Sequence, residues 1–211
     1  IEGGFIKGSV ILLTGGTGTG KTIFSSQFLW HGLQKGESGL YITLEEDPSD
    51  IKEDAAAFGW DFDKFIEKGL CKIVYHDPGQ IDNISSAILS DLKEMDVKRL
   101  VIDSTAVMGM TIGDLSSIRR RIFGILSAIK RLKECTTLII SEIPEGSSAL
   151  SRFGVEEFLA DGVIVLNYLG MGQSERTLII RKMRRTNHST DSCPFTITKN
   201  GIVLRKTQSI L

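Results

Sequence analysis

Cysteine is scarce in this chain, and its spacing excludes two kinds of site. Among 211 residues there are three cysteines, Cys71, Cys135 and Cys193, which lie far apart along the sequence. No C-x-x-C pair and no Cys/His grouping has the spacing of a metal-binding motif. We therefore expect free thiols, mostly buried in the core, rather than a disulfide framework or a zinc site.

An excess of charge of one sign and long apolar runs are also lacking. Lys and Arg number 25 against 26 Asp and Glu, which gives a formal net charge of −1. The molecule as a whole therefore has no field that would hold nucleic acid or an anionic membrane, and such binding would need a local basic patch. No apolar run approaches the roughly 20 residues of a transmembrane helix, and no charged-then-apolar leader opens the chain. We expect a cytoplasmic protein that does not bind membranes.

The composition is typical of one ordinary globular domain. Hydrophobic residues make up 41% of the chain and charged residues 24%, a balance found in proteins that fold in water. A length of 211 residues suffices for one domain with a sizeable core and is short for two. We therefore expect a single domain over residues 1–211, and we find no internal repeat.

A glycine-rich stretch near the N-terminus carries the strongest functional signal. It fits the phosphate-loop (P-loop) pattern G-x-x-x-x-G-K-S/T at every fixed position. Its glycines allow backbone conformations that a Cβ would forbid, so that successive N–H groups can turn inward around phosphate oxygens. The stretch consists of Gly15, Gly16, Thr17, Gly18, Thr19, Gly20, Lys21 and Thr22.

The flanking segments have the character that a P-loop requires. Residues 10–13 are predicted to form a buried strand, and residues 23–30 an amphipathic helix whose N-terminus faces the phosphates. Lys21 would bridge the β- and γ-phosphates, and the Thr22 hydroxyl would ligate Mg²⁺. The sequence therefore predicts a site for a nucleoside triphosphate with magnesium.

Two adjacent carboxylates follow the next predicted strand, residues 40–44. In an open α/β sheet, ligands bind at the carboxyl ends of the strands, so Glu45 or Glu46 can reach a water aligned on the γ-phosphate. Hydrolysis requires such a base, and we favour Glu45. The alternative is that the acidic run only favours the following helix, for which Asp47 is the expected N-cap and Pro48 the first residue.

Two later strands also end on polar residues. The apolar run 99–102 closes on Asp103, the form taken by the acid that orients Mg²⁺ in P-loop proteins, although many parallel strands end on aspartate. The strand at 137–140 leads into Ser141 and Glu142, which are candidates for sensing the nucleotide. Strands that alternate with helices in this way predict an α/β fold with a mostly parallel central sheet flanked by helices.

Some residues away from this edge invite a functional role, but a structural role is favoured. Trp60, between two short helices, is expected to be a packing anchor rather than a base-stacking residue. His76 has no ligand partners at metal spacing, and we expect it to be solvated or to cap a helix. Residues 107–113 are expected to form a loop, with Thr111 and Asp114 at capping-box spacing before a long helix.

The C-terminal part of the chain predicts antiparallel hairpins. The expected strands are 162–167, 176–181, 195–198 and 202–204. A turn is expected at residues 170–172. Strand alternation places Lys182 and Arg184 on the same face, and neither has an obvious carboxylate partner nearby in the sequence. Such a pair of cations either has a function or is simply part of the surface, and we pursue the functional interpretation.

Six further motifs resemble those of the KaiC-type ATPases, a family of the RecA-like superfamily named after the cyanobacterial clock protein. In chain order they lie at 43–46 (TLEE), 57–60 (AFGW), 102–104 (IDS), 153–158 (FGVEEF), 182–184 (KMR) and 194–198 (PFTIT). Six collinear matches are hard to reach by chance. The resemblance implies a RecA-like P-loop NTPase fold. The clock protein carries two copies of the domain, and this chain resembles the first copy, whose activity is ATP hydrolysis.

The resemblance also implies roles for individual residues. Glu45, supported by Glu46, would act as the base, and Mg²⁺ would lie at Thr22 and Asp103. ATP would be held between the subunits of a ring, usually a hexamer. The phosphate contacts would come from Gly18, Thr19, Gly20, Lys21, Thr22 and Ile23. The neighbouring subunit would supply Lys182, Met183, Arg184, Thr186, His188 and Thr198, with the two cations as fingers on the γ-phosphate.

Three departures from the family pattern bear on specificity. Ala57 replaces a serine near the base, and Lys199 stands where the first clock domain has an acidic residue, which leaves the nucleotide base preference open. Glu157 and Phe158 stand where the second clock domain has its adjacent serine and threonine phosphate acceptors. We therefore expect no clock-type autophosphorylation.

The leading hypothesis is a Mg²⁺-dependent ATPase in a homo-oligomeric ring. Hydrolysis of ATP to ADP and phosphate would couple to conformation or to an unidentified protein partner. One alternative is a RecA-like recombinase that binds DNA, but the loops at 107–113 and 145–151 that would face a central channel contain no Lys or Arg, which argues against nucleic acid. The other alternative is a nucleotide-holding scaffold with negligible turnover.

Overall fold

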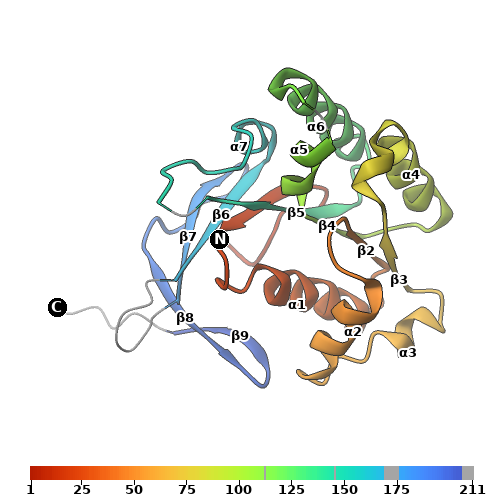
Figure 1. The fold of residues 1–211 in the computed structure, drawn as a ribbon. Helices are drawn as coiled ribbons and strands as arrows, with labels where there is room; N and C mark the ends of the chain where they lie inside the picture. Colours follow the sequence, from red (N-terminus) through yellow and green to blue (C-terminus); the bar gives the residue numbers. More distant parts are fainter. Residues whose placement is uncertain (112, 145, 169–175, 206–211) are drawn as a thin grey trace.

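The computed structural model of the chain describes residues 1–111, 113–144, 146–168 and 176–205. Within these residues the centre of the molecule is one nine-stranded sheet with the order β3-β2-β4-β5-β1-β6-β7-β8-β9. Neighbouring strands from β3 to β6 pair in parallel, and β7, β8 and β9 continue the sheet antiparallel at one edge (Figure 1). The expected α/β architecture with C-terminal antiparallel hairpins is confirmed. The turn predicted at 170–172 lies outside the described residues.

The strands fall where apolar runs predict them. They are β1 (Val10–Gly15), β2 (Gly39–Thr43), β3 (Cys71–Tyr75), β4 (Arg99–Asp103), β5 (Thr136–Glu142), β6 (Gly162–Tyr168), β7 (Arg176–Met183), β8 (Cys193–Thr198) and β9 (Gly201–Leu204). The carboxyl ends of β1, β2, β4 and β5 therefore meet at one edge of the sheet, as parallel pairing requires.

Helices cover both faces of the parallel part of the sheet (Figure 1). One face carries α4 (Ile81–Glu94), α5 (Met108–Thr111) and α6 (Leu115–Lys130), and the other carries α1 (Lys21–Gln34), α2 (Pro48–Ala56) and α3 (Asp63–Ile66). The remaining helical turns are η1 (Pro78–Gln80), η2 (Thr105–Val107) and α7 (Glu156–Leu159).

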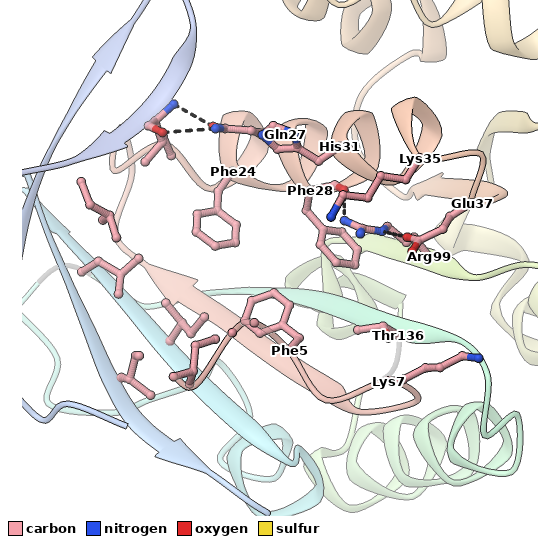
Figure 2. Close-up of a pocket in the computed structure, with 18 of the residues that line it drawn as sticks. Phe5, Lys7, Phe24, Gln27, Phe28, His31, Lys35, Glu37, Arg99 and Thr136 are labelled. Carbon is pink, nitrogen blue, oxygen red and sulfur yellow. Dashed lines mark hydrogen bonds and ion pairs between the residues drawn. The ribbon is translucent and has the colours of Figure 1, made fainter. Parts of the chain in front are cut away.

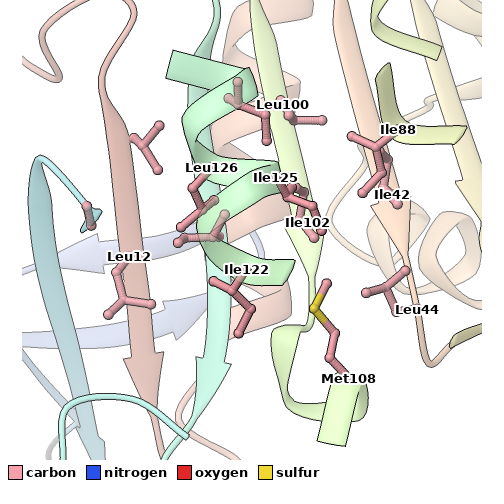
Figure 3. Close-up of a cluster of buried hydrophobic side chains, with 14 of the residues drawn as sticks. Leu12, Ile42, Leu44, Ile88, Leu100, Ile102, Met108, Ile122, Ile125 and Leu126 are labelled. Atoms are coloured by element: carbon pink, nitrogen blue, oxygen red, sulfur yellow. The ribbon is translucent and has the colours of Figure 1, made fainter. Parts of the chain in front are cut away.

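Two sets of side chains bury the two faces. Along β1, Val10 and Leu12 belong to the set under α4, α5 and α6, whereas Ile11 and Leu13 belong to the set under α1, and all four are 0% exposed. Figure 3 shows the first set, in which side chains of the three helices meet those of β1, β2 and β4. Burial on both faces explains why these strands are continuous apolar runs rather than alternating ones.

Two local predictions around α5 are wrong. Where the sequence predicts a loop, η2 and α5 follow β4, because Val107 and Met108 are only 5% and 1% exposed and complete the core. The N-cap of α6 is Asp114, whose side chain accepts a hydrogen bond from the Ser117 N–H at 2.8 Å. The N-cap is therefore not Thr111, which is the last residue of α5.

The predictions for Trp60 and His76 have different outcomes. Trp60 is 5% exposed and stacks on Phe58 with ring centroids 4.8 Å apart, which confirms a packing role. His76 is neither freely solvated nor a helix cap: its Nε2 lies 2.7 Å from a carboxylate oxygen of Asp91, which also accepts from Lys72 at 2.6 Å. Asp91 is itself buried, so this cluster ties α4 to the edge strand β3.

The cysteines agree with a further expectation. Cys71 and Cys135 are buried free thiols, and Cys193 is a partly exposed one. No helix in the described part of the chain is long and apolar enough to cross a membrane.

A cleft of about 880 Å³ opens on the α1 side of the sheet (Figure 2). It lies between α1, the segment around Phe5 and strands β6, β7 and β9, with Phe24 and Phe28 among its lining residues. Arg99, which donates to Glu37 at 2.6 Å, lies at its charged end. Of the described residues that the sequence predicts for the site, none lines this cleft. The candidate site lies instead at the carboxyl edge of the sheet.

Candidate functional site

The P-loop connects the end of β1 to the start of α1. Gly18 and Gly20 have φ angles of 71° and 98°, a left-handed conformation that is readily adopted only by glycine. At Gly15 the constraint is space, since a Cβ there would lie 2.4 Å from the carbonyl oxygen of Leu166 on β6. The backbone path of the loop thus requires these glycines.

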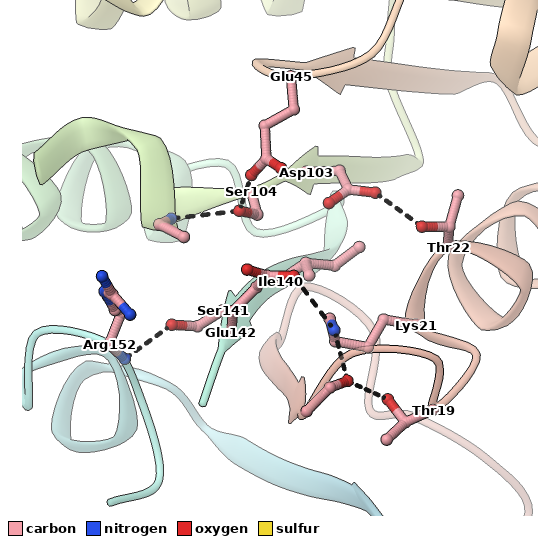
Figure 4. A network of polar contacts seen from close by, with 12 residues as sticks. Thr19, Lys21, Thr22, Glu45, Asp103, Ser104, Ile140, Ser141, Glu142 and Arg152 are labelled. Atoms are coloured by element: carbon pink, nitrogen blue, oxygen red, sulfur yellow. Dashed lines mark hydrogen bonds and ion pairs between the residues drawn. The ribbon is translucent and has the colours of Figure 1, made fainter. Parts of the chain in front are cut away.

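Lys21 is the cation at the N-terminus of α1. Its side chain is 9% exposed, and its Nζ lies 3.6 Å from a carboxylate oxygen of Glu142 at the end of β5. The ammonium also donates to the carbonyl of Gly16 at 2.9 Å, as does the hydroxyl of Thr19 at 2.9 Å (Figure 4). Gly20 precedes α1 and has no side chain to cap it, so the first N–H groups of the helix remain available. Together with Lys21 they suit an anion such as a phosphate group.

Asp103 at the end of β4 faces Thr22. The Thr22 Oγ1 and a carboxylate oxygen of Asp103 are 3.5 Å apart (Figure 4), and the hydroxyl of Tyr41 donates to the same oxygen at 2.7 Å. Burial, aided by the charges of Glu45 and Glu46, raises the pKa of Asp103 to about 7 even though the Tyr41 hydrogen bond and Lys21 act to lower it.

A hydroxyl and a carboxylate in contact are hard oxygen donors of the kind that Mg²⁺ takes from proteins, with waters and phosphates completing its shell. The pair Thr22 and Asp103 fits that chemistry. In the described residues no group of three or more His, Cys, Asp or Glu side chains could hold a metal ion by itself.

The two glutamates after β2 have different surroundings. Glu45 accepts a hydrogen bond from the hydroxyl of Ser104, the residue that follows Asp103, so its carboxylate lies at the end of β4 (Figure 4). The Glu46 N–H donates to Thr43 Oγ1 at 2.9 Å. Burial, with the nearby charges of Asp54 and Asp50 on α2 and of Glu45, raises the pKa of Glu46. Glu45 is thus the glutamate held toward the Asp103 side of the site.

Asp47 has the structural role expected of it. Its side chain accepts from the Ser49 N–H at 2.8 Å, and Pro48 is the first residue of α2. Within the acidic run, Asp47 therefore caps α2, whereas the carboxylate of Glu45 contacts Ser104.

The residues expected to reach a neighbouring subunit lie around the end of β7 and in β8. Lys182 donates to the carbonyl oxygens of Glu157 and Ala160 at 3.0 and 2.6 Å, and burial, with the charges of Arg184 and Lys130, lowers its pKa. Arg184 lies 3.5 Å from Asp161. Arg184 thus has a carboxylate partner in the fold, but one that lies 23 residues away in the sequence and not among its sequence neighbours.

The other four residues of that group are spread over the same region. Met183 is 7% exposed in the core, whereas Thr186 and His188 lie in the exposed segment between β7 and β8. Thr198 donates to the carbonyl of Gly201 at 3.2 Å within the β8–β9 hairpin. In the part of the chain that the structure describes, no hydrogen bond or ion pair joins any of the six residues to the P-loop of the same chain.

Two residues of the site escaped the sequence reasoning. Tyr41 lies in the middle of β2, and the sequence alone cannot distinguish it from the other buried residues of that strand. Arg176, the first residue of β7, donates to the carbonyl of Gly18 at 3.2 Å and lies over the Tyr168 ring at 4.5 Å. The pairing of β6 with β1 brings this hairpin beside the P-loop, and sequence alone gives no signal for that pairing.

Comparisons with known proteins point to one family. The family described as "ATPase: KaiC" matches residues 1–209. A UPF0273 protein of Pyrococcus furiosus is 35% identical over 222 residues, which cover 97% of this chain and 88% of that protein. The circadian clock oscillator protein KaiC of Synechococcus elongatus is 36% identical over 217 residues, covering 95% of this chain but 41% of the clock protein.

The fold is shared with a solved relative. The crystal structure of a KaiC-like protein from Pyrococcus horikoshii superposes with a TM-score of 0.89 at 41% sequence identity, covering 98% of this chain and 93% of that one. Similarity over nearly the whole of both chains identifies the nine-stranded sheet as a RecA-like fold of the KaiC type.

Proposed function

Because this chain belongs to the KaiC ATPase family, we propose that it binds ATP with Mg²⁺ and hydrolyses it to ADP and phosphate at the interfaces of a homo-oligomeric ring. The observation that supports this most is that four side chains converge where β1, β2 and β4 end. They are Lys21, Thr22, Asp103 and Glu45. Each of these side chains is held by contacts within the chain before any ligand binds. We take residues 1–211 as one ATPase domain.

In this proposal the triphosphate lies along the P-loop. Gly15, Gly16, Thr17, Gly18, Thr19, Gly20 and Ile23 supply the surrounding backbone. Lys21 lies against the β- and γ-phosphates, and Mg²⁺ is held by Thr22 and oriented by Asp103. Bound Mg²⁺ supplies positive charge that offsets the developing charge on the phosphate oxygens. Glu45 positions and deprotonates the attacking water, and Ser104 and Glu46 support it.

The neighbouring subunit completes the site. Arg184 is the residue best placed to reach across, because its side chain is 51% exposed and its ion pair with Asp161 is long at 3.5 Å. Such an exposed pair contributes little to stability and can be exchanged for a phosphate. Lys182, Met183, Thr186, His188 and Thr198 would line the nucleotide on the same side. A hexamer is the ring size that the family resemblance implies.

Exposed aromatic side chains support an oligomer. Phe158 on α7 is 71% exposed and Phe123 on α6 is 55% exposed, and these two helices are in contact. Large exposed side chains of this kind are ones that a neighbouring subunit would cover in the proposed ring. Conformational change in the ring, or the binding of a protein partner, is what the nucleotide state would control. Glu157 and Phe158 offer no hydroxyl for autophosphorylation.

The proposal is tested first by nucleotide binding to the Lys21→Ala variant. Loss of the ammonium removes the fixed positive charge facing the β- and γ-phosphates, so tight ATP binding should be lost. Lys35→Ala, which changes an exposed lysine just after the same helix, is the control and should bind ATP like the wild type. Unchanged affinity in Lys21→Ala would refute the phosphate site.

Phosphate release and size in solution then separate the alternatives. Steady-state phosphate release that requires Mg²⁺, together with a discrete ring size that depends on ATP, is the expected result. Tight binding without turnover would favour the nucleotide-holding scaffold. An open-ended series of sizes, with DNA binding that persists at physiological salt, would favour the recombinase alternative.

A further inference from the structure

The short helix α7 carries a buried carboxylate that the proposed hydrolysis does not use. Glu156 is 0% exposed, although a carboxylate is rarely buried completely without a reason. One of its oxygens accepts hydrogen bonds from Thr105 Oγ1 at 3.2 Å and from Ser141 Oγ at 3.0 Å, and the other accepts from the Val155 N–H at 3.2 Å. Glu156 thus holds together two segments that are distant in the sequence.

The first of these segments is the end of β4. Thr105 directly follows Ser104, whose hydroxyl donates to the proposed base Glu45. A shift of the Glu156 carboxylate would therefore be transmitted through one hydroxyl and one peptide unit to the residue that holds the base.

The second segment is the end of β5. Ser141 directly precedes Glu142, whose carboxylate lies 3.6 Å from Lys21 Nζ. The Ser141 hydroxyl also accepts from the Arg152 N–H at 3.0 Å (Figure 4), which fixes the segment leading into α7. Glu156 thus contacts both the segment that holds the proposed base Glu45 and the segment that places Glu142 beside Lys21.

The other end of α7 holds the two cations. Lys182 donates to the carbonyl oxygens of Glu157, the second residue of α7, and of Ala160, the residue just after the helix, at 3.0 and 2.6 Å. Arg184 lies 3.5 Å from Asp161, the next residue, and its N–H donates to the Asp161 carbonyl at 2.9 Å. A displacement of α7 would therefore move the backbone and side chains of residues 182–184.

We propose that α7 couples the phosphate site of its own chain to the cations that this chain offers to the neighbouring subunit. Glu156 is a positioning residue: it touches no reacting atom and acts through Thr105 and Ser141. The nucleotide bound in one subunit then sets the position of Lys182 and Arg184 against the nucleotide of the next. Turnover at one interface therefore depends on the state of the adjacent site. This inference rests on the proposed role of the cations between subunits.

The test uses rings in which the altered chain cannot hydrolyse ATP itself. Wild-type protein is mixed with a large excess of Glu45→Gln, which should still bind ATP, of Glu45→Gln/Arg184→Ala, or of Glu45→Gln/Glu156→Gln, under conditions of subunit exchange. Most wild-type sites then face an altered neighbour, and phosphate release per wild-type subunit reports on that neighbour. We expect both double variants to lower this release relative to Glu45→Gln alone, Glu156→Gln by about fivefold or more, as allosteric coupling typically gives.

Matched controls separate coupling from damage to the fold. Glu157→Gln, combined with Glu45→Gln, changes the next carboxylate on the same helix, which contacts Ser151 instead, and this variant should match Glu45→Gln alone. If Glu156→Gln does not fold, Thr105→Val removes one of the hydroxyls that hold the carboxylate and should lower release in the same direction.

The outcomes distinguish the inference from the function on which it rests. A loss with Arg184→Ala but not with Glu156→Gln or Thr105→Val would overturn the coupling and leave the shared site standing. No loss with any double variant in demonstrably mixed rings would overturn the shared site itself. A loss with Glu156→Gln but not with Arg184→Ala would show that Glu156 acts by another route, which also contradicts the coupling.

Discussion

At the scale of single residues, the proposed site gathers carboxylates around one cation. Glu45, Glu46 and Asp103 lie at the ends of neighbouring strands, and their mutual repulsion is one cause of the raised pKa values of Glu46 and Asp103. Lys21 acts in the opposite direction on Asp103. A site with surplus negative charge is suited to a divalent cation, which inverts the local electrostatics once it binds.

The role of Glu45 gives the prediction at this scale. Glu45→Gln keeps the shape of the side chain and an acceptor for the Ser104 hydroxyl but removes the base. ATP should still bind, while phosphate release should fall by about two to four decades, the usual contribution of a positioned base. Binding and turnover measured on the same preparation check this.

The neighbouring glutamate supplies the control. Glu46→Gln changes a carboxylate whose surroundings are the acidic residues of α2, and it should reduce turnover much less. A larger loss with Glu46→Gln than with Glu45→Gln would mean that the base is the second glutamate.

At the scale of elements, the parallel strands and the P-loop could be predicted from the sequence. Strands such as β1 are buried on both faces and therefore consist largely of continuous apolar residues, a pattern typical of parallel strands covered by helices. The loop is recognisable because its backbone path demands glycine at Gly15, Gly18 and Gly20. Local sequence determines both features.

The short helices and the polar contacts between elements could not be predicted. α5 forms because Val107 and Met108 pack into the core beneath α6, and that contact depends on the whole fold. From the sequence, Glu156 would be expected on the surface. It is instead buried, and it accepts hydrogen bonds from Ser141 and Thr105, which lie 15 and 51 residues away. Contacts of this kind follow from topology, which the sequence pattern does not specify.

A stability prediction concerns Asp161, which joins three elements. It accepts from the Val10 N–H at 3.0 Å and from Lys130 at 3.0 Å, and its side chain is 13% exposed. Asp161→Asn weakens both hydrogen bonds, so the free energy of unfolding should fall by about 1–3 kcal/mol, the range for bonds to a charged group. Urea unfolding without nucleotide measures this, and Asp54→Asn, an exposed change on α2, should have little effect.

The same contact predicts a pH dependence. Burial acts to raise the pKa of Asp161, but the hydrogen bonds from Val10 and Lys130 outweigh it and lower the pKa. The stabilisation is therefore present above the unfolded pKa of about 3.9 and is lost as pH falls through the lower folded value. Below about pH 4 the wild type should lose this stability and approach Asp161→Asn. A difference between the two proteins that stays constant through this range would contradict the assignment.

At the scale of the whole molecule, the proposed active site is formed by residues of two chains. The P-loop, Glu45 and Asp103 lie on one subunit, while Arg184 and the residues near it are offered to the next. Separate subunits would then bind ATP without completing the charge stabilisation needed for turnover. The functional ring, the role of Arg184 as an arginine finger and the coupling through α7 all depend on this shared site.

The most direct test of the shared site mixes two inactive proteins. Lys21→Ala lacks the phosphate site, and Arg184→Ala should bind ATP but turn it over about three to five decades more slowly, as for other arginine fingers. In mixed rings, an intact P-loop from one parent meets an intact Arg184 from the other at some interfaces. The account predicts that phosphate release recovers on mixing, with a maximum at intermediate ratios. No recovery at any ratio, in oligomers shown to contain both proteins, would contradict it.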